Sequence, residues 1–157
     1  MDLTPYRHAD DITIAAPPEA VYALISDITR MGEWSPECTG GTWVDDAHEW
    51  FQGANERDGR TWETRCRVDV ADPGREFTFT NCGFDGTVNL VRWSYTMTPD
   101  GDGTVLRESW EVLDDYPVFM NSINADMDVA GYLDGQRPAV MSGMAATLAA
   151  LAQAFRT

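Results

Sequence analysis

The sequence predicts an α+β domain in which a curved antiparallel sheet closes around one long C-terminal helix. Residues 60–70 and 91–97 alternate between apolar and polar side chains, as strands with one buried face do. The run Asp-Gly-Asp-Gly at 100–103 predicts a tight hairpin, so neighbouring strands run antiparallel. Apolar residues recur every three or four positions between Met141 and Phe155, which predicts an amphipathic helix. The concave face of the sheet is the one large apolar surface available to that helix.

The first elements are a short strand at 11–15 and a helix at 18–30. Pro18 suits a first helical turn, and Val21, Leu24 and Ile28 follow at helical spacing. A second, short helical turn ends at Trp34, because a proline at position 36 disfavours helical geometry at the residue before it.

Six strands follow, between residues 41 and 112, joined by turns such as Asp-Pro-Gly at 72–74. On the first clear strand one face carries Trp62, Thr64, Cys66, Val68 and Val70. On the last strand one face carries Leu106, Glu108, Trp110 and Val112. The chain contains no internal repeat or linker, so residues 1–157 are expected to form one domain.

Residues 113–136 lack a regular pattern, because glycines at 131 and 135 and a proline at 138 interrupt the helical spacing of their apolar side chains. This segment is expected to be either a lid over an entrance or a plain packed connection.

The charge of the chain excludes several classes of function. The formal net charge is −15, and all eleven cationic side chains are arginine. Nucleic-acid binding requires clustered cations, so no nucleic-acid partner is expected. No lysine is available for a Schiff base.

Other features set expectations for location and cofactors. The first residues lack the apolar core of a secretory signal, and no apolar stretch is long enough to insert in a membrane, so a cytoplasmic location is expected. Three cysteines and two histidines without metal-type spacing predict neither a metal site nor another cofactor.

Several motifs, in this order, carry a resemblance to a known family: RMGEWSPE at 30–37, FQGAN at 51–55, residues 62–68, RWSY at 92–95, ESWE at 108–111 and GMAATL at 143–148. The chain resembles the polyketide cyclase/dehydrase group of the START and Bet v 1-like superfamily (SRPBCC) from about residue 10 to 155. The resemblance implies a helix-grip fold with a ligand space between sheet and helix. The superfamily includes cyclases, carriers, hormone receptors and chaperone activators, so it leaves the function open.

Strand parity then predicts which side chains face the ligand space. The expected ligand-binding residues are Trp34, Phe51, Trp62, Thr64, Phe77, Phe79, Trp93, Trp110, Met141, Met144 and Leu148. Aromatic and methionine side chains suit a flat or flexible apolar ligand. The alternative is that they only fill a core, and for Trp34 a place at the entrance and a place in the core are equally expected.

Three polar residues are candidate catalytic groups. Burial would raise the pKa of Glu108 and make it an acid or base, with Tyr95 as a proton or hydrogen-bond donor on the adjacent strand. The amide of Asn55 could hold a carbonyl. The alternative for Glu108 is a structural ion pair with an arginine. Neither histidine is expected on the inward face.

Three functions follow from these predictions. The first is a carrier or sensor that binds a lipid-like or polyketide-like molecule without altering it. The second is an aromatase or cyclase that directs an aldol closure and dehydration through Glu108, Tyr95 and Asn55. The third is a co-chaperone-like interaction protein. The sequence leaves the oligomeric state open.

Overall fold

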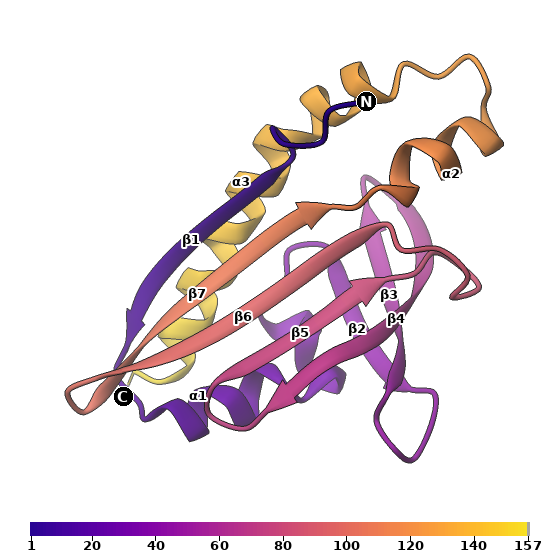
Figure 1. Ribbon diagram of the computed structural model, residues 1–157. Helices are drawn as coiled ribbons and strands as arrows, with labels where there is room; N and C mark the ends of the chain where they lie inside the picture. The colour runs from indigo at the N-terminus through magenta and orange to yellow at the C-terminus, as the bar shows by residue number, and fades with distance from the viewer. Residues whose placement is uncertain (157) are drawn as a thin grey trace.

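The computed structural model describes residues 1–156, and its centre is one antiparallel sheet with a long helix across its concave side (Figure 1). This arrangement confirms the predicted α+β helix-grip fold. In chain order the elements are β1 (Arg7–Ile14), α1 (Pro18–Ile25), the 3₁₀ helix η1 (Ile28–Glu33), β2 (Cys38–Trp43), β3 (Trp50–Arg57), β4 (Arg60–Asp72), β5 (Glu76–Asn81), β6 (Val91–Asp100), β7 (Gly103–Val112), α2 (Asp115–Ile123) and α3 (Val129–Ala154).

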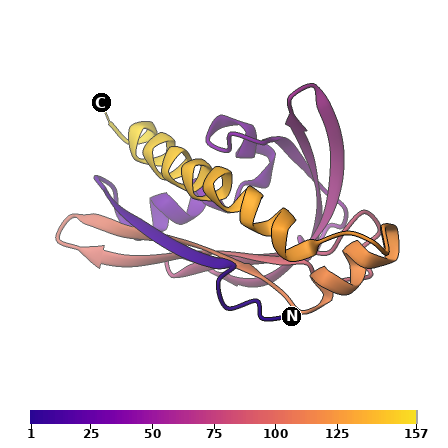
Figure 2. The same ribbon diagram turned by 90° about the horizontal axis from the view of Figure 1, so that it is seen from above.

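The sheet has seven strands in the order β1-β7-β6-β5-β4-β3-β2. Strands β2 to β7 form a meander of hairpins, and β1 pairs with the last strand of the chain rather than with the second. In Figure 2 the β3–β4 hairpin rises on the same side of the sheet as α3. The inner face is therefore the surface between α3 and the curled part of the sheet, where core side chains meet.

The predicted helix at 18–30 is divided in two. α1 ends at Ile25, and the side chain of Asp27 accepts a hydrogen bond from the backbone N–H of Thr29 at 3.2 Å. Asp27 thereby caps η1, which is a separate helix. η1 ends just before Trp34, as predicted, and packs against β2.

A β-bulge changes the face of one predicted inward residue. The register between β4 and β5 shifts between Val68 and Val70. An extra residue reverses the alternation beyond it, so Val70 lies on the outer face and is 37% exposed. The prediction that Val70 shares the face of Trp62 and Val68 was wrong for this reason.

Residues 113–136 are more regular than predicted, because α2 and the first two turns of α3 lie in this segment. The side chain of Asp128 caps α3 by accepting from the N–H of Gly131 at 3.0 Å. Pro138 lies inside α3 on its exposed side, and the buried stripe from Val129 and Leu133 continues past it to Met144. The helix therefore forms across Gly131, Gly135 and Pro138, which had been expected to interrupt it, because its apolar side chains at helical spacing are buried.

The N-terminal segment holds this part of α3 in place. The hydroxyl of Tyr6 donates to Asp134 Oδ1 at 2.8 Å, and to the carbonyl of Ala130 at 3.3 Å. Tyr6 also belongs to a buried apolar cluster with Trp110, Leu133 and Met144. A second, larger cluster joins α1, η1 and the C-terminal half of α3 to the middle of the sheet.

Candidate functional site

A polar pair lies in the middle of the inner face. The register across four neighbouring strands sets Asp10, Glu108, Tyr95 and Phe77 side by side in one row. Residues that pair directly across antiparallel strands point to the same face, so all four side chains share the inner side. Glu108 and Tyr95 were predicted on this face, whereas Asp10 was not among the predicted site residues.

Glu108 is almost completely buried, with 2% of its surface exposed. The hydroxyl of Tyr95 donates a hydrogen bond to Glu108 Oε1 at 3.0 Å. Oε2 of the same carboxyl has no hydrogen-bond partner within residues 1–156. None of the ion pairs in that part of the chain involves Glu108. The alternative prediction, that Glu108 forms a structural ion pair with an arginine, was therefore wrong.

The surroundings of Glu108 keep it protonated at neutral pH. Loss of solvent around the buried carboxyl raises its pKa from 4.5 to about 8; the Tyr95 hydrogen bond opposes this shift, and the charge of Asp10 adds to it. Burial, followed by the proximity of Glu108, raises the pKa of Tyr95 well above 10. Both groups are therefore neutral hydrogen-bonding groups in an apolar surrounding.

Large apolar side chains surround this pair. The rings of Phe51 and Phe79 meet edge to face with centroids 5.1 Å apart, and Phe77 lies 6.0 Å from Phe79. The buried members of the predicted binding set are Trp34, Phe51, Phe77, Phe79, Trp110, Met144 and Leu148. Trp34 was expected either at the entrance or in the core, and it packs in the larger core cluster.

The other predicted residues are only partly covered. Trp62, Thr64 and Trp93 are half-buried on the inner face, and Met141 on α3 is 39% exposed, whereas Met144 is 1% exposed. Met141 was predicted to lie opposite the sheet; it lies instead at the margin of the buried stripe of α3. The partial exposure of Trp62, Thr64 and Trp93 shows that this part of the inner face is not fully covered by other side chains.

Asn55 is not next to the polar pair. It lies on β3, three strands from Tyr95 on β6, and is half-buried. Its side-chain amide donates long hydrogen bonds to the carbonyl of Trp62 and the hydroxyl of Thr64, both at 3.4 Å. The structure thus brings two of the three predicted catalytic residues into contact and leaves the third at the other end of the inner face.

Arg57, which was not among the predicted site residues, joins β3 to α3 and to the segment after η1. Its guanidinium donates to Gln136 Oε1 on α3 at 2.7 Å and to Glu37 Oε2 after η1 at 2.8 Å. Arg57 is the last residue of β3, so these contacts join the tip of the β3–β4 hairpin to α3. Strand parity alone could have placed Arg57 inward, since it continues the alternation of Phe51 and Asn55.

His8 is a correction to the sequence analysis, which expected no histidine on the inward side. It pairs directly with Trp110, so the register gives the two residues the same face. The second histidine, His48, stacks on Trp43 in the β2–β3 turn, with ring centroids 4.0 Å apart. His8 and Asp10 were missed because the strand was predicted to begin at residue 11, whereas β1 begins at Arg7; the alternation of Ile12 and Ile14 continues to both residues.

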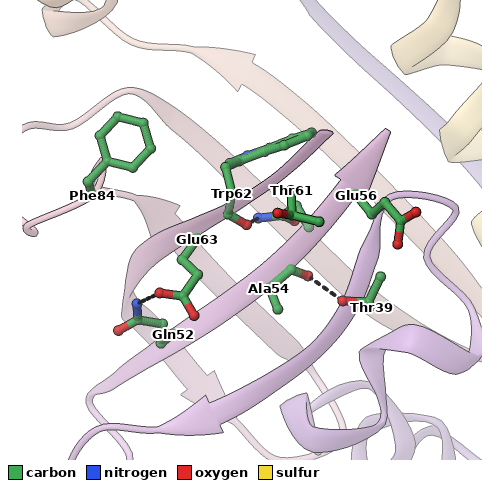
Figure 3. A pocket seen from close by; sticks show the side chains of 9 residues that line it. Thr39, Gln52, Ala54, Glu56, Thr61, Trp62, Glu63 and Phe84 are labelled. Atoms are coloured by element: carbon green, nitrogen blue, oxygen red, sulfur yellow. Dashed lines mark hydrogen bonds between the residues drawn. The ribbon is translucent and has the colours of Figure 1, made fainter. Parts of the chain in front are cut away.

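Two grooves lie on the outer face of the sheet. The first, shown in Figure 3, has a volume of about 540 Å³ and lies over β2, β3 and β4, with the exposed ring of Phe84 at its margin. Its lining includes Gln52 and Glu63, which are hydrogen bonded to each other at 2.8 Å. The second groove, of about 460 Å³, lies over β1, β7 and β6. Neither includes the Glu108–Tyr95 pair.

Within residues 1–156, no three His, Cys, Asp or Glu side chains are grouped as metal ligands would be. None of the helices within residues 1–156 combines the length and the apolar composition of a membrane span.

Comparison with known proteins gives a consistent family. The sequence profile of the family described as "Polyketide cyclase / dehydrase and lipid transport" matches residues 7–156. The solution structure of the polyketide-cyclase-like protein Cgl2372 from Corynebacterium glutamicum is 41% identical, with a TM-score of 0.65 over 93% of this chain and 88% of that one. No curated protein matches in sequence.

More distant structures share the fold. A START superfamily protein from Mycobacterium smegmatis is 16% identical, with a TM-score of 0.67 over 96% of this chain and 99% of that one. The di-domain aromatase/cyclase StfQ of the steffimycin biosynthetic pathway is also 16% identical, with a TM-score of 0.69 over 95% of this chain. This chain spans about half of StfQ, covering 49% of its length.

Proposed function

Because the chain belongs to the polyketide cyclase/dehydrase and lipid transport family, we propose that it binds an apolar, uncharged small molecule between the inner face of the sheet and α3, as a carrier or sensor. The observation that carries this proposal is the Glu108 carboxyl, which is buried among apolar side chains with one oxygen unengaged. A buried polar atom without a partner costs free energy, and a ligand oxygen that pairs with it removes that cost.

The protonation of Glu108 defines the chemistry of the ligand. With the Tyr95 hydroxyl donating to Oε1, a proton on Oε2 is free to donate to an acceptor such as a ketone, ester or hydroxyl oxygen. An ionised fatty acid would bring a negative charge next to Glu108 and Asp10, which already share this row. The rest of the ligand contacts the aromatic rings of the wall and Met144.

The ligand enters at the end of the inner face where Trp62, Thr64 and Trp93 keep solvent contact. Arg57 crosses this end through its hydrogen bonds to Gln136 and Glu37. Its side chain is 39% exposed, so these contacts are weak enough to open and close without unfolding the sheet. An entrance held by exposed hydrogen bonds suits a protein that must load and release its ligand.

The proposal is tested with three probes of equal chain length: a long-chain methyl ketone, the corresponding fatty acid and the corresponding alkylamine. Titration of the ¹⁵N-labelled protein with each probe gives the affinity. The ketone is expected to bind most tightly at neutral pH and to weaken above the pKa of Glu108, about 8. Absence of binding by all three probes would contradict an apolar site, and tightest binding of the fatty acid would contradict the proposed ligand chemistry.

A second candidate is a cyclase or dehydrase acting on a polyketide-like chain, and the Glu108–Tyr95 pair favours it. A carboxyl with a pKa of about 8 exchanges a proton readily near neutral pH, as a general acid or base must. In this role the ionised form of Glu108, a minority at neutral pH, takes a proton from an acidic methylene and gives it to the departing hydroxyl, which leaves as water, while Tyr95 holds the carboxyl in place. Asn55 then contacts a carbonyl three strands away, which requires an extended substrate.

Glu108→Gln separates the two candidates. The glutamine amide still donates a hydrogen bond, but it cannot accept and return a proton at neutral pH. A carrier is expected to keep its affinity for the ketone within a few fold in this variant. A cyclase is expected to keep the affinity and to lose turnover of a model poly-β-ketone by about a hundredfold or more. Equal turnover by the variant and the native chain would rule out proton transfer by Glu108.

A further inference from the structure

A second surface, on the outer face of the sheet, gathers hydrogen-bond donors. Strands β6, β7 and β1 are neighbours, and their register sets Ser94, Ser109 and Ala9 in one row. Both serines are half-buried, and within residues 1–156 neither hydroxyl makes a hydrogen bond. They line the groove of about 460 Å³ on this face. The small side chains of the row form its floor.

Arginines flank this row on both sides. Arg92 and Arg7 belong to the adjacent row at one end, and Arg107 belongs to the adjacent row at the other. Adjacent rows on one face are two residues apart along a strand, or about 7 Å. An extended arginine side chain covers about that distance, so guanidinium groups from both ends can reach the serine hydroxyls.

These arginines are available to a ligand. Arg92 and Arg7 are exposed, and neither forms an ion pair within the described chain. Arg107 is held only by a 3.6 Å contact with Asp11, in which both side chains are more than half exposed. Such a contact contributes little to stability and exchanges easily for a better partner.

The balance of charge in the groove differs from that of the protein. The chain carries a net charge of −15, yet three of its eleven arginines line this groove with a single carboxylate, Glu111. Guanidinium groups present paired N–H donors that match the oxygens of phosphate, sulfate and carboxylate. Hydroxyl and guanidinium donors around one depression are the composition of an anion site, in a protein whose net charge of −15 repels anions overall.

We propose that this groove binds the oxyanion group of a small molecule, a phosphate, sulfate or carboxylate, which accepts hydrogen bonds from Ser94, Ser109 and Arg92. The site lies on the opposite side of the sheet from Glu108, so it is independent of the ligand site proposed above. The alternative is an ordinary solvated sheet face, on which an anion finds only a diffuse charge.

The test is a titration of the ¹⁵N-labelled protein with inorganic phosphate at constant ionic strength, with chloride as the balancing anion. Saturable shifts are expected at the backbone amides of Ser94, Ser109 and Arg92. Arg92→Gln is expected to weaken phosphate binding about tenfold, through loss of one charge-assisted hydrogen bond. The matched control is Arg75→Gln, which removes the same charge from an exposed arginine in the β4–β5 turn and is expected to change nothing.

A third variant tests the role of the groove's own carboxylate. Glu111 pairs directly with both Arg92 and Arg7 in the register, so it competes with an incoming anion. Glu111→Gln is expected to strengthen phosphate binding severalfold. Shifts that do not saturate, or equal weakening by Arg92→Gln and Arg75→Gln, would overturn the proposal, because both describe a general effect of charge and not a site.

Discussion

Tyr95 and Glu108 pair directly across β6 and β7, and the tyrosine hydroxyl donates to one carboxyl oxygen of the glutamate at 3.0 Å while the other oxygen has no partner in residues 1–156. This relationship connects the fold to the proposed function. The sheet buries the carboxyl, burial keeps it protonated, and protonation makes it a hydrogen-bond donor among buried apolar side chains.

The burial of Glu108 makes stability depend on pH. Between pH 4.5 and about 8 the unfolded chain carries an ionised Glu108, whereas the folded protein keeps the proton. The unfolded state then binds fewer protons, so the free energy of unfolding falls as pH rises, by up to ~1.4 kcal/mol per pH unit from this group. Above that window its contribution is constant.

Glu108→Gln removes this titration. The difference between the free energies of unfolding of the variant and the native chain is expected to grow in favour of the variant from pH 5 to pH 8. Urea denaturation of both proteins at several pH values measures it. A difference that is the same at every pH would show that Glu108 titrates normally in the folded state.

Tyr95→Phe tests the hydrogen bond itself. The Tyr95 hydroxyl lowers the pKa of Glu108, so its removal is expected to raise that pKa further and to cost about 1 kcal/mol of stability. The carboxyl ¹³C shift of Glu108 followed against pH reports the pKa. Tyr116→Phe, which removes a half-buried hydroxyl from α2, serves as the control and is expected to leave the Glu108 titration unchanged.

Arg57→Gln tests the bridge across the entrance. Loss of its contacts with Gln136 and Glu37 is expected to speed the release of a bound methyl ketone, with a stability change of at most about 1 kcal/mol. Arg60 pairs with Arg57 across the hairpin and is exposed, so Arg60→Gln is the matched control. If the two variants release the probe at the same rate, Arg57 has no special role at the entrance.

Two adjacent glycines on β2 test the packing that holds the curled end of the sheet. A Cβ at Gly41 would lie 2.7 Å from the carbonyl oxygen of Ile28, whereas a Cβ at Gly40 has no atom within 4 Å. Gly41→Ala is expected to destabilise the protein by about 1–3 kcal/mol, because the backbone of η1 must move. Gly40→Ala is expected to stay within about 0.5 kcal/mol. Chemical denaturation separates the two, and equal effects would contradict the close contact of β2 with η1.

The fold could be predicted because its main signals are local. Alternation of side chains, the turn at 100–103 and the spacing from Met144 to Leu151 are each visible within a few residues. Val70 was assigned to the wrong face because a bulge reverses parity and leaves no mark in the sequence. The early start of α3 was missed because Pro138 is tolerated on its exposed side.

The site could be predicted only in part, for a different reason. Glu108 and Tyr95 belong to strands joined by a hairpin, so their pairing follows from the turn between them. Asp10 reaches the same row from the other end of the chain, and its place depends on a pairing that no local pattern encodes. The link from Arg57 to Gln136 depends in the same way on how α3 crosses the sheet.

The most direct test of an interior ligand site is native mass spectrometry of the freshly purified protein, with organic extraction of anything bound. The native chain is compared with two variants of α3. Met144→Trp places a larger side chain at a position that is 1% exposed and faces the proposed ligand site, whereas Met141→Trp places it at a position that is 39% exposed. Circular dichroism checks that each variant is folded. An uncharged apolar molecule is expected on the native chain and on Met141→Trp, and none on folded Met144→Trp. A native chain that carries no molecule and takes up none of the ketone, acid or amine probes would contradict the proposed interior ligand site, as would a folded Met144→Trp that still carries the same ligand.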